Sequence, residues 1–275
     1  MRIRVDYRTH YRYAAPAKSI IQLLRLTPRP HEGQRVVRWQ VDIDADAKLA
    51  KGEDALGNIT QTAFIAGPVN ELEVAVSGEI ETWDTHGVVR GAVERFGPEV
   101  FLRTTDLTAP DEDLAAFAHD CAGAAGDDPL QRLHELMMAI RGRVTFDTAP
   151  THSATTAVEA FAGRRGVCQD LSHIFIAAAR TLGVPARYVS GHLARDDGPI
   201  EQEASHAWAE AHVPDLGWVG FDAVNGICPT PTYVRVAVGL DYLGAAPVRG
   251  SRAGGGPEKM TVRLQVSHAA QQTQS

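Results

Sequence analysis

The sequence predicts an α+β protein in which an antiparallel β domain precedes a core of helices packed on an antiparallel sheet. Apolar and polar residues alternate along 37–43 and 72–76, as they do in strands with one buried face. Apolar residues then recur at helical spacing along 110–144 and again along 168–182. Strand-like stretches return within 186–223, so helix and sheet share the second part of the chain.

The β part is expected to span residues 1–85 and to form a sandwich-like domain with one apolar and one solvated face. Gly and Pro are frequent along 86–110, which is therefore expected to be a connector. The core of helices and sheet is expected at 111–267. The polar tail, residues 268–275, is expected to be disordered.

The composition is that of an ordinary globular protein, with 44% hydrophobic and 22% charged residues over 275 positions. Residues 1–40 are basic, whereas the whole chain carries a formal net charge of −7. A basic arm can bind nucleic acid. In "RIRVDY", however, the arginines alternate with Ile3, Val5 and Tyr7, as on the solvated face of a strand. We therefore expect no nucleic-acid partner.

The expected location is the cytoplasm, without membrane attachment. No apolar run is long enough to span a bilayer, and "MRIRVDYRTHYRY" lacks the apolar centre of a signal peptide. The cysteines Cys121, Cys168 and Cys228 contain no C-x-x-C pair and cannot make a disulfide framework. Reduced thiols in a reducing compartment are the simpler interpretation.

The segment "RRGVCQDLSHIFIAAARTLGVPARYVSG" places Cys168 in the first turn of the helix expected along 168–182. On a helical wheel Cys168 lies within about 20° of Phe175, so its thiol faces the packed side. The N–H groups of a first turn have no intrahelical partner, and the helix dipole there favours a thiolate over a thiol. A buried structural cysteine needs neither property, so this position indicates a nucleophile. Cys121, inside an earlier helix, is expected to serve packing.

A nucleophilic cysteine needs a base, and the base needs an orienting group. His206 and Asp222 lie on successive strand-like segments, and the sum of their positions is even, so they share a face of an antiparallel hairpin. A three-residue loop, Pro214 to Leu216, places Trp208 opposite Asp222 and makes His206 its diagonal neighbour. This geometry allows a hydrogen bond between the imidazole and the carboxylate.

Other histidines fit the role less well. His173 lies about 140° around the helix from Cys168 and points away from the thiol, which indicates a structural histidine. His192, on the preceding strand-like stretch, is an alternative base.

These blocks resemble the transglutaminase-like superfamily, whose thiol enzymes are related in mechanism to papain. The Cys block, the block "SHAWAEAHVPDLGWVGFDAVNG" and the spacing between them are similar to the family core. Residues 1–85 are similar to the β domain of its bacterial members. The resemblance implies a papain- and transglutaminase-like core with a triad of Cys168, His206 and Asp222.

The sequence departs from the cross-linking vertebrate members, which use a tryptophan upstream of the cysteine to hold the oxyanion. Residues 109–167 contain no tryptophan, so the Cys168 N–H is expected to act with a second donor. No calcium loop of the D-x-[DN]-x-[DN]-G type is present. Further candidates for contacts with the substrate or the oxyanion are Phe146, Gln169, Trp208 and Asn225.

The expected function is cysteine-dependent acyl transfer on an amide bond of a peptide or protein, with hydrolysis by a peptidase or amidase favoured. Two alternatives stay open: cross-linking of protein glutamine by transfer to an amine, and a non-catalytic module that binds peptides or proteins. Zinc held by the same three side chains is a weaker alternative, because paired ligands at short spacing are missing. No cofactor and no metal are expected, and the oligomeric state is not predicted.

Overall fold

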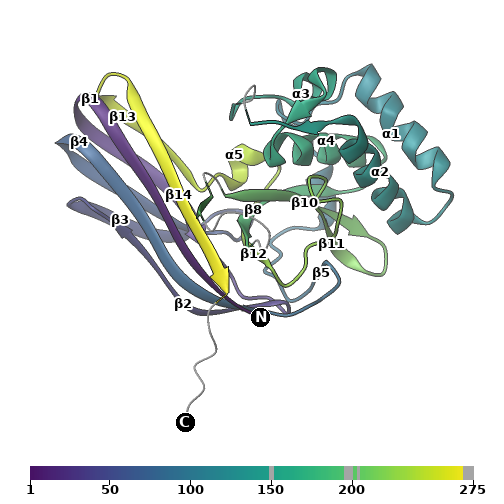
Figure 1. The fold of residues 1–275 in the computed structure, drawn as a ribbon, viewed down its shortest axis with the longest axis horizontal. Helices are drawn as coiled ribbons and strands as arrows, with labels where there is room; N and C mark the ends of the chain where they lie inside the picture. The colour runs from purple at the N-terminus through teal and green to yellow at the C-terminus, as the bar shows by residue number, and fades with distance from the viewer. Residues whose placement is uncertain (149–151, 195–200, 203–204, 269–275) are drawn as a thin grey trace, which may run out of the picture.

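The protein has two parts, a large curved sheet and a core of helices on a second sheet, which lie side by side in Figure 1. The structure is a computed structural model, and it describes residues 1–148, 152–194, 201–202 and 205–268. The α+β class predicted from the sequence is confirmed. None of the described helices is long and apolar enough to cross a membrane.

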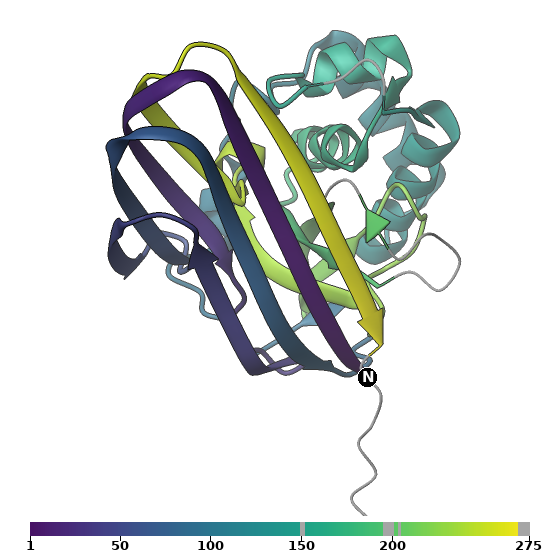
Figure 2. The same ribbon diagram turned by 60° about the vertical axis from the view of Figure 1, so that its left-hand side comes forward.

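The first sheet is antiparallel and is built around one very long strand. Its seven strands run in the order β2-β4-β1-β14-β9, with β13 also paired to β1 and β3 to β4. They are β1 (Arg2–Thr27), β2 (Gln34–Ile43), β3 (Ala47–Glu53), β4 (Ile59–Thr82), β9 (Glu201–Gln202), β13 (Val248–Gly254) and β14 (Glu258–His268). Figure 2 shows β14, in yellow, beside β1, in purple.

The predicted boundaries of the β domain need correction at the far end of the chain. The strands within residues 248–267, expected in the core, instead pair with β1 and complete the first sheet, and His268, expected in the tail, ends the last of them. β1 has two long edges, and β4 covers only one of them, so the other edge requires these C-terminal strands. The tail beyond residue 268 lies outside the described residues.

The strands of this part form one sheet whose long strands bend, so that β1 pairs with β14 before the bend and with β13 after it. Tyr11, Tyr13 and Ile20, from the two sides of the bend, belong to a hydrophobic cluster within this part, as expected of a sandwich-like domain. Another stretch of its apolar face is covered by the core. Ile3 and Val5 of β1 belong to the same hydrophobic cluster as Ile174 and Phe175 of the core, and all four are fully buried. The two parts therefore share one hydrophobic core.

The core sheet is also antiparallel, with the strand order β12-β8-β10-β11-β5. Its strands are β5 (Val88–Val89), β8 (Ala186–Leu193), β10 (His206–Val213), β11 (Gly217–Phe221) and β12 (Tyr233–Gly239). The expected connector, residues 86–110, thus supplies one edge strand of this sheet. It also contains a short 3-10 helix, Pro98–Leu102.

The helices of the core surround α4, the helix that begins at Cys168. They are α1 (Glu112–Ala124), α2 (Pro129–Arg143), α3 (Ala157–Gly163), α4 (Cys168–Thr181) and the short α5 (Tyr242–Ala245). Figure 1 shows α1 to α4 above the core sheet. Helix α4 packs against β10 and β8 on one side and against α1, α2 and α3 on the other. Because other elements cover α4 on all sides, more of its residues are buried than the single apolar stripe of the sequence predicts.

A buried ion network fixes the spacing of β8, β10 and β12. Glu210 of β10 is fully buried and accepts hydrogen bonds from Arg187 and Arg235, each with an N–O distance of 2.7 Å. Burial alone would raise the pKa of Glu210, but the two guanidinium groups outweigh it and lower the pKa to about 2. The strand that carries His206 is therefore linked by charge to its neighbour β8 and, beyond β8, to β12.

Candidate active site

The start of α4 is fixed by the residues around Cys168. Val167 is extended (φ −100°, ψ −176°), and its backbone N–H donates to Asp170 Oδ2 at 2.8 Å. Gly166 lies against Asp170, whose Cβ is only 2.6 Å from where a Cβ on Gly166 would be, so only glycine fits there. The half-buried Cys168 thus occupies the first helical position, beside N–H groups without intrahelical partners.

His206 and Asp222 come from the two strands of one hairpin, as the parity of their positions predicts. Val213 pairs with Gly217 across a three-residue turn, and Ala209 pairs with Phe221. His206 begins β10, and Asp222 directly follows β11. The distance from His206 Nε2 to Asp222 Oδ2 is 2.6 Å, and the carboxylate is fully buried.

The other side of the imidazole meets the cysteine. The side chain of Cys168 forms a hydrogen bond with His206. Because Asp222 occupies Nε2, the ring nitrogen available to Cys168 is Nδ1. Burial alone would lower the pKa of His206, but hydrogen bonds and charge from Asp222 and Cys168 outweigh it and raise the pKa to about 10. The site therefore holds a protonated imidazole between two acidic groups at neutral pH.

Asp222 is surrounded by donors on both oxygens. Oδ2 accepts hydrogen bonds from His206, from Asn225 Nδ2 at 2.6 Å and from the Tyr233 hydroxyl at 2.7 Å. Oδ1 accepts the backbone N–H groups of Val224 at 2.9 Å and Asn225 at 3.2 Å. Burial would raise the pKa of Asp222, but these hydrogen bonds and the imidazolium charge keep it below its ordinary value.

Tyr233 is the residue of this site that the sequence analysis missed. It begins β12 and lies eleven positions after Asp222, beyond a turn whose path the sequence pattern does not define. The only signal was general: a buried tyrosine hydroxyl needs a hydrogen-bond partner. Asn225 was expected to contact the substrate or the oxyanion, whereas the structure places it on the carboxylate of Asp222.

The other predicted candidates lie at two places. Trp208 is buried and packs beside His206, with ring centroids 6.2 Å apart, so it forms a wall of the site. Phe146 is 53% exposed and pairs with Gly166, close to the start of α4. Gln169 follows Cys168, and its Nε2 donates to the carbonyl of His152 at 3.5 Å. Phe146 and Gln169 are therefore on the helix-start side of the site, and Trp208 is on the hairpin side.

His173, interpreted as structural, and His192, the alternative base, do not join Cys168, His206 and Asp222. His173 is fully buried, and its Nε2 accepts the backbone N–H of Tyr242 at 3.0 Å. His192 packs between the rings of Tyr7 and Trp39, where the two sheets meet. Burial lowers the pKa of both to about 4, so they are neutral at pH 7. Within the part of the chain that the structure describes, no three His, Cys, Asp or Glu side chains gather as metal ligands.

Comparison with known proteins identifies the family of this fold. A model of the transglutaminase-like superfamily matches residues 115–223, and a model of the bacterial transglutaminase-like N-terminal region matches residues 3–81. The chain belongs to the transglutaminase-like superfamily. Its N-terminal region is of the bacterial type.

Similar proteins from mycobacteria match nearly the whole chain, and a third relative matches part of it. An uncharacterized protein of Mycobacterium leprae is 28% identical over 98% of this chain and 99% of its own length. One of Mycobacterium tuberculosis is 30% identical over 90% of this chain and 87% of its own length. A protein-glutamine gamma-glutamyltransferase of Pseudomonas aeruginosa is 29% identical over 38% of this chain and 17% of its own length.

A solved structure shows the same fold. It is a Cytophaga hutchinsonii protein described as a candidate cysteine protease, which superposes with a TM-score of 0.79 at 19% identity. The match covers 98% of this chain and 91% of that protein. The long first sheet and the helix-and-sheet core are therefore one shared architecture.

The protonation of His206 gives a first testable prediction. In the wild type we expect the imidazole of His206 to stay protonated up to about pH 10, because Asp222 and Cys168 both stabilise the cation. In Cys168→Ala one of these causes is gone, so the pKa of His206 should fall. Histidine ring signals followed by NMR over a pH titration measure this, and the neutral His173 and His192 are internal references. A His206 signal that titrates near 6.5 in both proteins would show that the imidazole is not paired.

Proposed function

We propose that this protein is a cysteine-dependent enzyme that transfers the acyl group of an amide, with Cys168 as nucleophile, His206 as acid and base, and Asp222 as the orienting carboxylate. The observation that carries the proposal is the bridging imidazole. It bonds to Asp222 at 2.6 Å on one side and to Cys168, at the start of a helix, on the other.

The chemistry follows from this arrangement. The Cys168 thiolate attacks the carbonyl carbon, and the negative charge moves onto the carbonyl oxygen, which the Cys168 N–H stabilises. As the C–N bond breaks, the His206 imidazolium gives its proton to the leaving amine, and a thioester remains. Water then attacks the thioester while the neutral imidazole takes its proton, which releases a carboxylic acid and restores the thiolate–imidazolium pair.

Hydrolysis is the preferred outcome, and transfer to an amine uses the same residues. The names of similar proteins include both outcomes, since one is a glutamyltransferase and another a candidate protease. We favour water as acceptor because a cross-linking enzyme acting inside a cell needs regulation, and the sequence shows no calcium loop.

The test is a substrate profile with a choice of acceptor. The protein is incubated with a complex peptide mixture and a fluorescent primary amine, and the products are identified by mass spectrometry. New peptide ends or new free acids in the wild type indicate hydrolysis, and amine adducts on glutamine indicate cross-linking. Both should vanish in Cys168→Ala and persist in Cys121→Ala, a second half-buried cysteine outside the site. An unchanged peptide mixture would support the binding-module alternative.

A further inference from the structure

Tyr233 connects the proposed triad to the first sheet. Its hydroxyl donates to Asp222 Oδ2 at 2.7 Å, and only 5% of the residue is exposed. The ring of Tyr233 lies edge-on to Trp208, with centroids 5.4 Å apart, and 5.8 Å from the ring of His206. Tyr233 therefore donates a hydrogen bond to Asp222 and packs against the rings of His206 and Trp208.

Tyr233 begins the edge strand of the core sheet, and this edge faces the first sheet. β12 pairs with β8 on one side only. On its other side, backbone N–H and C=O groups need partners from elsewhere, because buried backbone groups are rarely left unpaired. Those partners are side chains of the first sheet.

Two side chains of the first sheet hold β12 on either side of Tyr233. The amide of Gln34 pairs with the backbone of Arg235: Nε2 donates to the carbonyl at 2.8 Å, and Oε1 accepts the N–H at 2.8 Å. The hydroxyl of Thr82 donates to the carbonyl of Pro231. Gln34 and Thr82 are neighbours across the β2–β4 ladder, and both are 2% exposed. The first sheet thus fixes the backbone two residues before and two residues after Tyr233.

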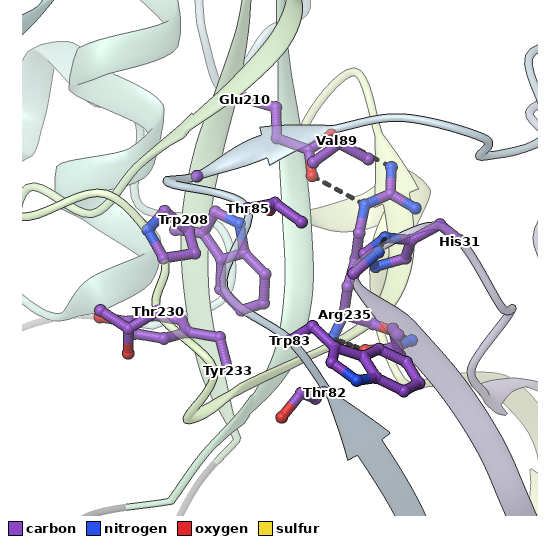
Figure 3. Close-up of a pocket in the computed structure, with 14 residues that line it drawn as sticks. His31, Thr82, Trp83, Thr85, Val89, Trp208, Glu210, Thr230, Tyr233 and Arg235 are labelled. Atoms are coloured by element: carbon purple, nitrogen blue, oxygen red, sulfur yellow. Dashed lines mark hydrogen bonds and ion pairs between the residues drawn. The ribbon is translucent and has the colours of Figure 1, made fainter. Parts of the chain in front are cut away.

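The space between these groups is too small to be a substrate pocket. Figure 3 shows Trp208 and Tyr233 on one side of a cavity, with His31 and Trp83 on the other and Arg235 bonded to Glu210. The cavity volume is about 40 Å³, room for one or a few water molecules. The contact between β12 and the first sheet is therefore closely packed, so the first sheet can fix the position of β12.

We propose that the first sheet is a positioning element of the triad, in which Gln34 and Thr82 hold β12 so that Tyr233 donates its hydrogen bond to Asp222. The inference rests on the proposed function of the triad and gives the N-terminal region a part in it. Tyr233, Gln34 and Thr82 are positioning residues, since they act through Asp222.

The expected signature is a shift in pH dependence. A hydrogen bond to a carboxylate favours its ionised form, so its loss raises the proton affinity of Asp222. The ionisable groups next to this carboxylate are His206 from β10, Tyr233 from β12 and, through the imidazole, Cys168 from α4. Arg141 of α2 donates to the carbonyl of Val224 in the adjoining turn. Because the His206 imidazolium interacts with both Asp222 and Cys168, a stronger proton affinity at Asp222 is expected to move the acid limb of the labelling profile to higher pH.

Asn58, which directly precedes β4, is a matched control because its side chain also bonds to β12. Its side-chain amide pairs with the backbone of Val238 in the same two-bond manner, at 2.8 Å for each bond, and it is 5% exposed. It lies at the other end of β12, away from Tyr233. Asn58→Ala should therefore lower stability as Gln34→Ala does, without reaching Asp222.

The experiment measures the rate of Cys168 alkylation by iodoacetamide against pH, read by intact mass, on the full chain. In Tyr233→Phe the acid limb is expected to move up by about one pH unit. Gln34→Ala and the isosteric Thr82→Val should shift it less, in the same direction, and should add nothing in the Tyr233→Phe background. Asn58→Ala should lower Tm and leave the limb in place.

The outcomes separate this proposal from the proposed function. A wild-type profile that does not depend on His206 overturns the function itself. A profile that does depend on His206 but is unchanged in Tyr233→Phe overturns the positioning role. Shifts of Gln34→Ala or Thr82→Val that add fully to that of Tyr233→Phe overturn the route through Tyr233. Thr82→Val removes a single hydroxyl, so it serves where Gln34→Ala does not fold.

Discussion

His206→Ala is expected to reduce amide turnover by about 10⁴-fold or more, because the variant loses both the proton donor for the leaving amine and the cation beside the thiolate. The same change should alter the pH dependence of Cys168 alkylation. In the wild type, rapid labelling is expected below pH 7, since the imidazolium stabilises the thiolate there. In His206→Ala, labelling should follow that of an ordinary thiol, which ionises near pH 8.5.

His212→Ala is the matched control for this prediction. His212 lies further along the same strand, β10, and its ring packs edge-on against Trp218, away from the cysteine. Cys168 in the His212→Ala variant should be alkylated at the wild-type rate over the whole pH range. Rapid labelling below pH 7 that persists without His206 would mean that another group activates the thiol. Slow labelling below pH 7 in both the wild type and His206→Ala would favour the binding-module alternative.

The parts of the site that depend on local pattern could be predicted from the sequence. The first helical turn fixes the surroundings of Cys168, and the two-residue period of strands fixes which residues of a hairpin share a face. The first rule singled out Cys168 and the second put His206 beside Asp222, whereas the meeting of Cys168 with this pair was implied by the family resemblance. Asn225 was singled out as well, but as a contact of the substrate or the oxyanion, whereas the structure shows it bonded to the carboxylate of Asp222.

The parts that depend on distant segments could not be predicted. Periodicity shows that a strand has one apolar face, but it does not say which segment covers that face or pairs with its edge. Residues 248–267 were therefore assigned to the core, although their strands pair with β1. Tyr233 and Gln34 were missed for the same reason, since Gln34 meets Arg235 across 201 residues of sequence. Only the folded chain shows that the first sheet reaches the triad.

Asp222→Asn is expected to lower amide turnover about 10⁴-fold. Both oxygens of the Asp222 carboxylate accept hydrogen bonds, and an asparagine replaces one of these acceptors by a donor. An asparagine has to turn its NH₂ group to one side or the other. If the NH₂ group takes the position of Oδ1, it meets the backbone N–H groups of Val224 and Asn225, which are donors and cannot accept its hydrogen bond. If it takes the position of Oδ2, it donates to His206 Nε2, so the ring proton moves to Nδ1. With a proton on Nδ1, the neutral imidazole cannot take a proton from Cys168.

The same variant should also lose stability, by about 1–3 kcal/mol in the free energy of unfolding at pH 7, since a buried donor or acceptor is left unpaired in either orientation. Urea unfolding measures this loss and a peptide substrate measures turnover. Asp241→Asn is the control: Asp241 is 8% exposed and caps α5 through Oδ1, which accepts the N–H of Gly244 at 3.1 Å, and an amide oxygen serves equally well there. Near wild-type turnover in Asp222→Asn would show that the imidazole keeps its working tautomer without the carboxylate, and the orienting role assigned to Asp222 would then be wrong.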